Sequence, residues 1–137
     1  MIPVNKIKLT KSDAKVVSNI VKKNWISSAG KEVKIFEKKI GSLIGKKYCS
    51  SVSSGTAALE IALKVINLKK TDEVIVPNFT IFSTVMAVIK QGAKPILIDC
   101  DLKTWNMKIK DIKKKINLNT RAIVATHIYG YPIEIDK

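Results

Sequence analysis

Short apolar runs alternate with helical patterns along most of this chain, and this alternation restricts its possible folds more than any other feature. Apolar runs lie at residues 73–77, 95–99 and 121–126, and residues 47–52 form a further strand-like run. Between them, apolar residues recur every three or four positions over about 56–67, 81–91 and 108–117. Continuous apolar strands joined by helices are typical of parallel sheets that helices cover on both faces. The sequence therefore predicts an α/β fold with three layers and a mostly parallel sheet.

The first 46 residues show a different pattern, with helical periodicity but no strand. Helices are predicted over about 13–23, capped by Ser12, and over about 31–44. Trp25–Gly30 is predicted as the loop between them. We therefore divide the chain into an N-terminal helical segment, 1–46, and a sheet-containing segment, 47–137.

The net charge of +14 on 137 residues suggests a polyanionic partner. The distribution of the charge argues against nucleic acid. Arg121 is the only arginine, and the lysines are spread over every predicted helix without interleaved aromatic residues. Because arginine is preferred for bidentate contacts to phosphates and bases, we expect solvated lysine faces and no nucleic-acid partner. A basic α/β module that binds polyanions remains the alternative.

Membrane and metal sites are not expected either. No apolar run approaches the roughly 18 residues of a membrane span, and the N-terminus lacks the apolar core of a signal peptide. We therefore expect a cytoplasmic protein. Cys49 and Cys100 lie in or beside apolar runs, and His127 alone does not complete a zinc site with them. Free thiols and no metal are the expectation.

Polar or small residues follow each of the four predicted strands. The resulting loops are Ser53–Thr56, Asn78–Phe82, Cys100–Asn106 and His127–Pro132. The carboxyl ends of parallel strands meet at one edge of a sheet, where ligands of such folds bind. A ligand site built from these four loops is therefore predicted.

Ser54-Gly55-Thr56 is the segment of these loops that favours phosphate. It begins a predicted helix, so Gly55, Thr56 and Ala57 offer unpaired N–H groups, and Gly55 allows a close approach to the backbone. It lacks the Gly-Lys-Ser/Thr of a Walker loop and the glycine spacing of a dinucleotide fingerprint. Ordinary helix capping by Ser53 or Ser54 is the alternative interpretation.

Two other loops carry candidate side chains with open alternatives. Phe79 or Phe82 could cover a flat cofactor ring or belong to the core, and Thr80 is predicted to cap the helix that follows. His127 could carry a proton, act as an orienting hydrogen-bond donor, or serve only as a structural residue.

Several segments, in this order, match one family. They are Trp25-Ile26-Ser27-Ser28-Ala29-Gly30, Phe36-Glu37, Ser54-Gly55-Thr56-Ala57-Ala58-Leu59, Glu73-Val74-Ile75-Val76-Pro77-Asn78-Phe79-Thr80, Gly92-Ala93-Lys94-Pro95, Asp99-Cys100-Asp101 and His127-Ile128-Tyr129-Gly130. The chain resembles the DegT/StrS sugar aminotransferases, fold type I enzymes that use pyridoxal 5′-phosphate (PLP), and within them the nucleotide-sugar 4-aminotransferases. The resemblance covers essentially all 137 residues.

This resemblance implies a homodimer that moves an amino group from an amino acid, usually glutamate, to a nucleotide-linked keto sugar, as in surface-polysaccharide sugar synthesis. Gly55 and Thr56, with Ser54 nearby, would hold the PLP phosphate. Ile81 aligns with the position that covers the PLP ring, where relatives often carry Trp or Tyr, and Phe82 is one residue away. The substrate or dimer loop would comprise Trp25, Ser27, Ser28 and Gly30, with His127 and Tyr129 also near the site.

The resemblance also implies what these 137 residues lack. The acidic partner of the PLP nitrogen and the Schiff-base lysine of the family lie beyond position 137. We therefore expect the N-terminal part of a large PLP-binding domain, with no catalytic residue of its own and no activity in isolation. A dehydratase of the same family, in which histidine replaces that lysine, and a remnant without ligand remain alternatives.

Overall fold

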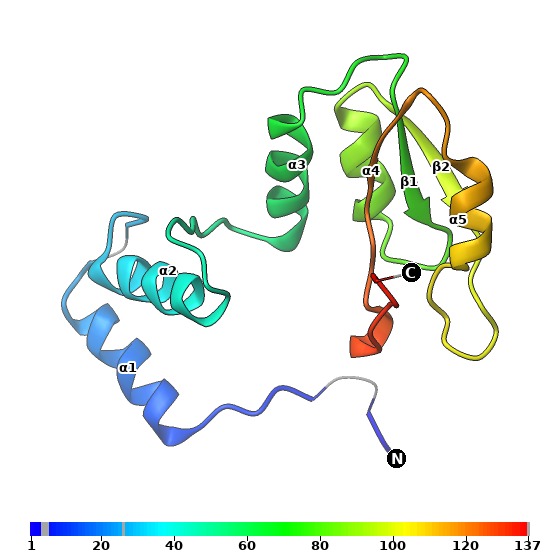
Figure 1. Cartoon of the computed structure of the whole chain (residues 1–137). Coiled ribbons are helices and arrows are strands. Elements are labelled where there is room, and N and C mark those ends of the chain that lie inside the picture. Colours follow the sequence, from blue (N-terminus) through cyan, green and yellow to red (C-terminus); the bar gives the residue numbers. More distant parts are fainter. Residues whose placement is uncertain (4–5, 26, 137) are drawn as a thin grey trace. The chain divides into compact units, whose positions relative to one another are not determined.

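The computed structural model describes residues 1–3, 6–25 and 27–136. The chain divides into two compact units, Met1–Ser51 and a second unit that begins at Val52 (Figure 1). None of the described helices has the length and apolarity that crossing a bilayer requires.

The first unit contains two helices, α1 (Lys11–Lys22) and α2 (Lys31–Leu43). The prediction that Ser12 caps the first helix is wrong, because Thr10 is the cap. Asp13 lies three residues after Thr10 and completes a capping box, in which Thr10 Oγ1 accepts from the N–H of Asp13 at 3.3 Å. The Asp13 carboxylate accepts from the N–H of Thr10 at 2.7 Å in return.

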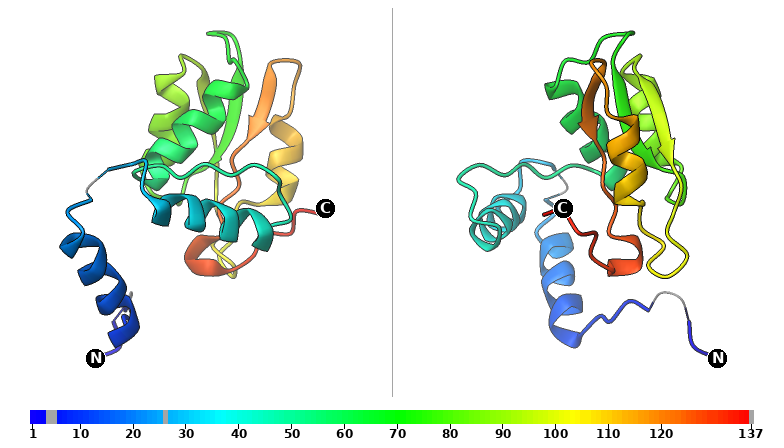
Figure 2. Two further views of the ribbon diagram at one scale, coloured as in Figure 1. Left: turned by 90° about the vertical axis from the view of Figure 1, so that its left-hand side faces the viewer. Right: turned by 45° about the vertical axis from the view of Figure 1, so that its right-hand side comes forward.

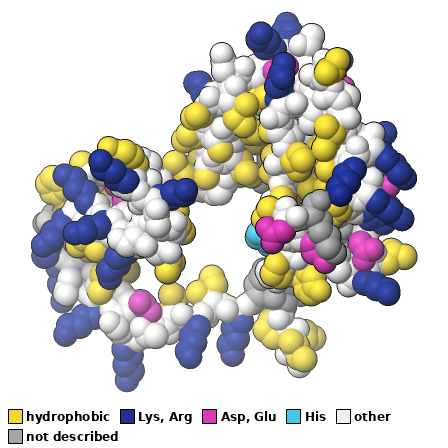
Figure 3. Space-filling view, viewed as in Figure 1, with side chains coloured by type: hydrophobic (Ala, Val, Ile, Leu, Met, Phe, Trp, Pro, Cys, Tyr) yellow, Lys and Arg dark blue, Asp and Glu magenta, His cyan; other side chains and the backbone are white. Residues whose placement is uncertain are grey.

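The first unit buries almost nothing by itself. In its described part, only Gly30 and Gly41 are buried. Hydrophobic side chains such as Val17, Phe36 and Leu43 are more than half exposed, and Figure 3 shows such side chains at the surface beside the lysines.

The strand predicted over residues 47–52 is absent from the structure, and that prediction is wrong. A strand needs a neighbouring strand to accept and donate its ladder hydrogen bonds, and the three described strands pair only with one another. In place of such pairing, the N–H and Oγ of Ser51 both donate to Glu37 Oε1, at 2.8 and 3.0 Å.

The second unit is an α/β fold, as predicted. Its elements are α3 (Gly55–Val65), β1 (Glu73–Pro77), α4 (Ser83–Lys90), β2 (Lys94–Ile98), α5 (Ile109–Lys115), β3 (Thr120–Ile123) and a short 3₁₀ turn, Ile128–Gly130. The strands are ordered β2-β1-β3, and both pairs are parallel. Helices α3 and α4 lie on one face of the sheet and α5 lies on the other (Figure 2). The prediction of three layers is therefore confirmed.

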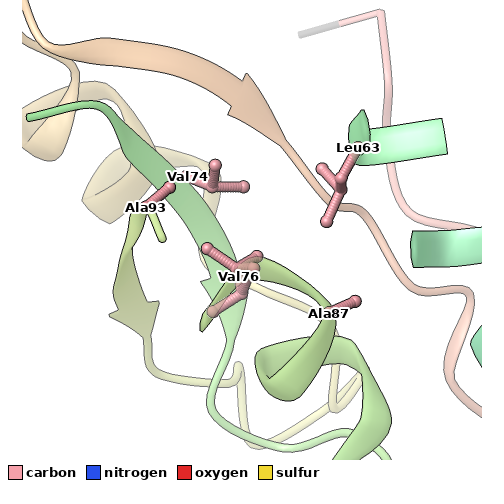
Figure 4. Packing of buried hydrophobic residues seen from close by; sticks show 6 residues of the cluster. Leu63, Val74, Val76, Ala87 and Ala93 are labelled. Atoms are coloured by element: carbon pink, nitrogen blue, oxygen red, sulfur yellow. The ribbon is translucent and has the colours of Figure 1, made fainter. Parts of the chain in front are cut away.

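The central strand β1 supplies side chains to a core on each face. Alternate residues of a strand point to opposite faces, so Val74 and Val76 pack with α3 and α4, while Ile75 packs on the side of α5. Figure 4 shows Val74 and Val76 facing Leu63 and Ala87. Because helices cover both faces, all three valine and isoleucine side chains are fully buried.

The prediction that Thr80 caps the next helix is also wrong. Helix α4 begins at Ser83, and its N-cap residue, Phe82, makes no side-chain capping bond. The N–H groups of Thr84 and Val85 already donate to the carbonyls of Ile81 and Phe82, at 3.0 and 3.1 Å. Because these N–H groups need no side-chain acceptor, the Thr80 hydroxyl is available for other partners.

Candidate functional site

The loops after β1, β2 and β3 lie at one edge of the sheet, where the strands end. The first turn of α3 lies at the same end of the second unit in Figures 1 and 2. Three of the four predicted loops thus follow observed strands, and the fourth, Ser53–Thr56, leads into α3 from an unpaired segment.

The start of α3 presents free donors to open space. Ser54 is the N-cap, and its Oγ accepts from the N–H of Ala57 at 3.2 Å. Among the described residues, the N–H groups of Gly55 and Thr56 have no hydrogen-bond partner. A Cβ added to Gly55 would meet no heavy atom within 4 Å. Capping by Ser54 and a phosphate site are therefore compatible, since two free donors at the positive end of a helix dipole suit a phosphate group.

Ile81 and Phe82 stand beside this edge as exposed apolar side chains. They are 72% and 71% exposed, so Phe82 does not belong to the core. Their backbone carbonyls are fixed by the first turn of α4. Exposed side chains on a fixed backbone suit a surface that covers a flat ring by contact.

Three threonine hydroxyls meet at Thr80, the residue that precedes Ile81. Thr80 Oγ1 lies 3.3 Å from Thr84 Oγ1 and 3.3 Å from Thr126 Oγ1. Thr84 is buried in α4, and Thr126 lies between β3 and His127. The cluster joins the loop after β1 to the segment after β3, and neither partner of Thr80 was predicted.

An aromatic pair joins the loops after β1 and β2. The rings of Phe79 and Trp105 have centroids 5.1 Å apart and planes at 48°, a tilted arrangement that aromatic rings favour. Trp105 has a φ of 60°, which is uncommon for a residue with a side chain. Phe79 therefore packs against a neighbouring loop at the edge of the sheet, outside both core clusters.

Asn106 fastens the segment that carries His127. Its Nδ2 donates to the carbonyls of Tyr131 and Pro132, each at 3.1 Å, and its Oδ1 accepts from the N–H of Ile128 at 3.3 Å. The residue is buried. Sequence reasoning missed this role, and the only signal was a polar residue at the end of a loop before a helix.

His127 has one nitrogen in structural use and one available. Its Nδ1 accepts from the N–H of Ile133 at 3.0 Å, so the ring proton lies on Nε2. Tyr129, two residues on, is exposed and has a φ of 48°. The bond to Nδ1 therefore gives His127 a structural role and leaves its Nε2–H as a hydrogen-bond donor.

Acidic residues of the loop after β2 are paired with nearby donors. A hydrogen bond from Lys108 Nζ at 3.2 Å, together with the N–H of Cys100, holds the pKa of Asp99 below its ordinary value. The N–H groups of Lys103 and Thr104 lower the pKa of Asp101 in the same way. Both carboxylates therefore shape the loop.

The predicted substrate or dimer loop lies in the first unit, between α1 and α2. Trp25, Ser27, Ser28 and Gly30 are described, whereas residue 26 of this loop lies outside the described residues. Ser27 accepts through its carbonyl from the N–H of Gly30 at 3.3 Å, and a Cβ on Gly30 would lie 3.3 Å from Trp25 Nε1. The structure groups these residues with one another, and their place beside the site remains a prediction.

The sequence and the fold of this chain were compared with those of known proteins. Residues 8–137 match the DegT/DnrJ/EryC1/StrS aminotransferase family. The chain is 38% identical to a GDP-perosamine synthase of Escherichia coli O157:H7 over 136 residues, which are 99% of this chain and 37% of that protein. The chain thus spans little more than a third of the length of that relative.

Solved structures agree with this match. The sugar aminotransferase CalS13 of Micromonospora echinospora superposes with a TM-score of 0.87 at 31% identity, over 99% of this chain and 37% of CalS13. An E. coli GDP-4-keto-6-deoxy-D-mannose-3-dehydratase with bound hydrated PLP gives 0.90 at 26% identity, over 98% of this chain and 36% of that one. The predicted resemblance is confirmed, and the chain belongs to the DegT/DnrJ/EryC1/StrS aminotransferase family.

Proposed function

We propose that this chain supplies the phosphate site and part of the ring site of a PLP-dependent aminotransferase. The enzyme would transfer an amino group from an amino acid, with glutamate as the expected donor, to a nucleotide-linked keto sugar. The start of α3 supports this proposal most directly, because the N–H groups of Gly55 and Thr56 have no partner among the described residues and a Cβ on Gly55 would meet no heavy atom within 4 Å. Bound PLP would supply an electron sink for bond breaking at the amino-acid substrate.

Each residue of the site has one proposed task. Gly55 and Thr56 donate backbone N–H groups to the phosphate, with the Ser54 cap holding the turn in place. Ile81 and Phe82 cover the ring by apolar contact. His127 would serve as a hydrogen-bond donor through Nε2–H, since its Nδ1 already accepts from the N–H of Ile133.

A charge placed at Gly55 tests the phosphate site. A side chain at this position meets open space, so Gly55→Asp and its neutral, nearly isosteric control Gly55→Asn should both fold. We expect Gly55→Asp to weaken PLP binding at least about tenfold, because the carboxylate repels the phosphate at close range, and Gly55→Asn to weaken it much less. Fluorescence titration measures both affinities, with pyridoxal, which lacks the phosphate, as a weakly bound comparison. Equal affinities for the two variants would contradict the proposal.

We also propose that residues 1–137 alone do not transaminate. This proposal rests on the family resemblance, which implies that the lysine to which the cofactor bonds lies outside residues 1–137. Borohydride treatment with PLP followed by peptide mass spectrometry should give no single, stoichiometrically labelled lysine. Complete labelling of one lysine would show that the chain carries its own site.

A GDP-linked 4-keto sugar is the proposed acceptor, since GDP-perosamine synthases of two organisms are 38% and 34% identical to this chain. A chimera of residues 1–137 with the remaining part of the E. coli relative should form the amino sugar from glutamate and GDP-4-keto-6-deoxymannose. The same chimera with Gly55→Asp should be nearly inactive. Activity of both chimeras would show that the phosphate is held elsewhere.

A dehydratase of the same family is the second candidate, because the E. coli dehydratase matches this fold with a TM-score of 0.90. The family resemblance implies that the residue that separates the two functions, lysine or histidine at the cofactor position, lies outside residues 1–137. Reading the coding sequence on from residue 137 tests this: a lysine would favour the transaminase and a histidine the dehydratase.

We further propose a homodimer as the active state, formed partly through the first unit. The exposed apolar side chains of α1 and α2 support this, because a monomer gains nothing by leaving them in water. Light scattering of the chimera should give the mass of two chains, and a monomer with full activity would contradict the proposal.

A further inference from the structure

The loop that follows β1 is anchored at three consecutive positions. Each anchor reaches a different neighbour: Asn78 donates its N–H to the Ile98 carbonyl at 2.8 Å, Phe79 packs on Trp105, and Thr80 meets the hydroxyls of Thr84 and Thr126. The loop therefore contacts β2, the loop after β2 and the segment after β3.

The two residues after these anchors are left uncovered. The side chains of Ile81 and Phe82 are largely exposed, although their carbonyls accept from the first N–H groups of α4. A backbone held on both sides restricts where these side chains can go, which reduces the entropy that a ligand must remove on binding.

Thr80 is the anchor closest to this exposed pair. A hydroxyl has one proton and two lone pairs, so Thr80 can donate to one neighbour and accept from the other. The Thr84 partner belongs to the same helix-start region, only four residues away. Thr126 is 46 residues away in sequence and is the partner that ties the loop to the strand end before His127.

We propose that the Thr80–Thr126 hydroxyl pair is a positioning contact. It holds Ile81 and Phe82 where they cover the ring of a phosphate-bearing aromatic ligand bound at the start of α3. Neither threonine touches the ligand, and both act through the loop. This inference rests on the proposed function, since the phosphate site at Gly55 and Thr56 places that ligand.

The first arm of the test measures the loop without ligand. Thr126→Val removes the hydroxyl while keeping the shape, and Thr126→Ser keeps the hydroxyl. Thr71→Val is the matched control, because Thr71 is an exposed turn residue before β1, at the other edge of the sheet. Amide hydrogen exchange of Thr84 and Val85 reports on the loop, since these N–H groups bond to Ile81 and Phe82.

At 3.3 Å the hydroxyl pair is long, so the expected effects are modest. We expect Thr126→Val to raise the exchange rates of both amides about fivefold. Thr126→Ser and Thr71→Val should leave them nearly unchanged.

The second arm separates the ring from the phosphate. Thr126→Val should weaken PLP binding about threefold to fivefold while leaving the binding of inorganic phosphate unchanged. Gly55→Asp should weaken the binding of both PLP and inorganic phosphate. Fluorescence titration measures the affinity for PLP, and nuclear magnetic resonance shifts of the Gly55 and Thr56 amides measure the affinity for phosphate.

The possible outcomes test the positioning contact, its effect on the ligand and the proposed function separately. Unchanged exchange in Thr126→Val, or an equal change in Thr71→Val, overturns the positioning contact. Faster exchange with unchanged PLP affinity overturns its role toward the ligand. Absence of both PLP and phosphate binding in the unchanged chain contradicts the proposed function, and the exchange rates still decide whether the pair holds the loop.

Discussion

The two units of this chain use apolar residues in opposite ways. The second unit packs its apolar side chains on both faces of a three-stranded sheet, and eleven of them are buried. The described part of the first unit has amphipathic helices with only two buried residues, both glycines. A sheet gathers side chains from distant parts of the chain, whereas two short helices have too little surface to cover each other. Stability should therefore reside in the second unit, and the first unit should depend on further contacts.

An isoleucine-to-alanine substitution in each unit should test this difference in burial most clearly. Ile75 is fully buried in β1, and Ile35 is 43% exposed on α2. Ile75→Ala should lower the free energy of unfolding by about 2–5 kcal/mol, through lost burial and a cavity. Ile35→Ala should cost well under about 1 kcal/mol. Urea unfolding of the whole chain measures both, and comparable losses would show that α2 is buried in solution.

Two glycines offer a second matched pair. A Cβ at Gly41 would lie 2.8 Å from the carbonyl oxygen of Lys46, whereas one at Gly55 would meet nothing within 4 Å. Gly41→Ala should destabilise the first unit by about 1–3 kcal/mol, because backbone must move. Gly55→Ala should be neutral or slightly stabilising, since alanine favours a helix. Thermal melting followed by circular dichroism measures both. A stable Gly41→Ala variant would mean that the turn after α2 is readily rearranged.

Loss of the cap of α3 should have a smaller effect. Ser54→Ala removes the acceptor for the N–H of Ala57 and should cost about 1 kcal/mol. Ser53→Ala is the control, because Ser53 is exposed and makes no hydrogen bond among the described residues. Urea unfolding distinguishes them, and equal losses would assign the cap to both serines.

The smallest expected effect concerns the cap of α1 and depends on pH. Hydrogen bonds from the side chain and N–H of Thr10 hold the pKa of Asp13 below its ordinary value of 3.8. The carboxylate form is the one that caps, so this stabilisation is present above pH 3.8 and is lost as the pH falls through the lowered pKa. The helical signal of α1 should decrease slightly in that range. Asp13→Asn should show no such step, and a step of equal size there would assign the change to another group.

Sequence predicted the parts of this structure that depend on repeated patterns. The runs that became β1 and β2 are apolar at every position that a two-faced sheet buries, and the helices between them follow from periodicity. Residues 47–52 show the limit of this reasoning. These residues were predicted as a strand, but a strand forms only beside a partner strand. The local sequence does not specify whether such a partner is present.

The site was predictable to a similar extent. Ser54-Gly55-Thr56 could be predicted as a phosphate-binding turn, because a helix start and small residues are local features of the sequence. The Thr80–Thr126 pair joins residues 46 positions apart, and Asn106 reaches residues 22 to 26 positions away. Such contacts follow from strand order, which no local pattern contains.

Asn106 also gives this edge of the sheet a chemical vulnerability. Its nitrogen faces two carbonyl oxygens and its oxygen faces one N–H group, so all three bonds require an amide in one orientation. Hydrolysis of that amide to a carboxylate exchanges a nitrogen for an oxygen and would set three oxygens against one another. Deamidation at this position would therefore break the two bonds that Asn106 donates to Tyr131 and Pro132 and weaken the attachment of the segment that carries His127.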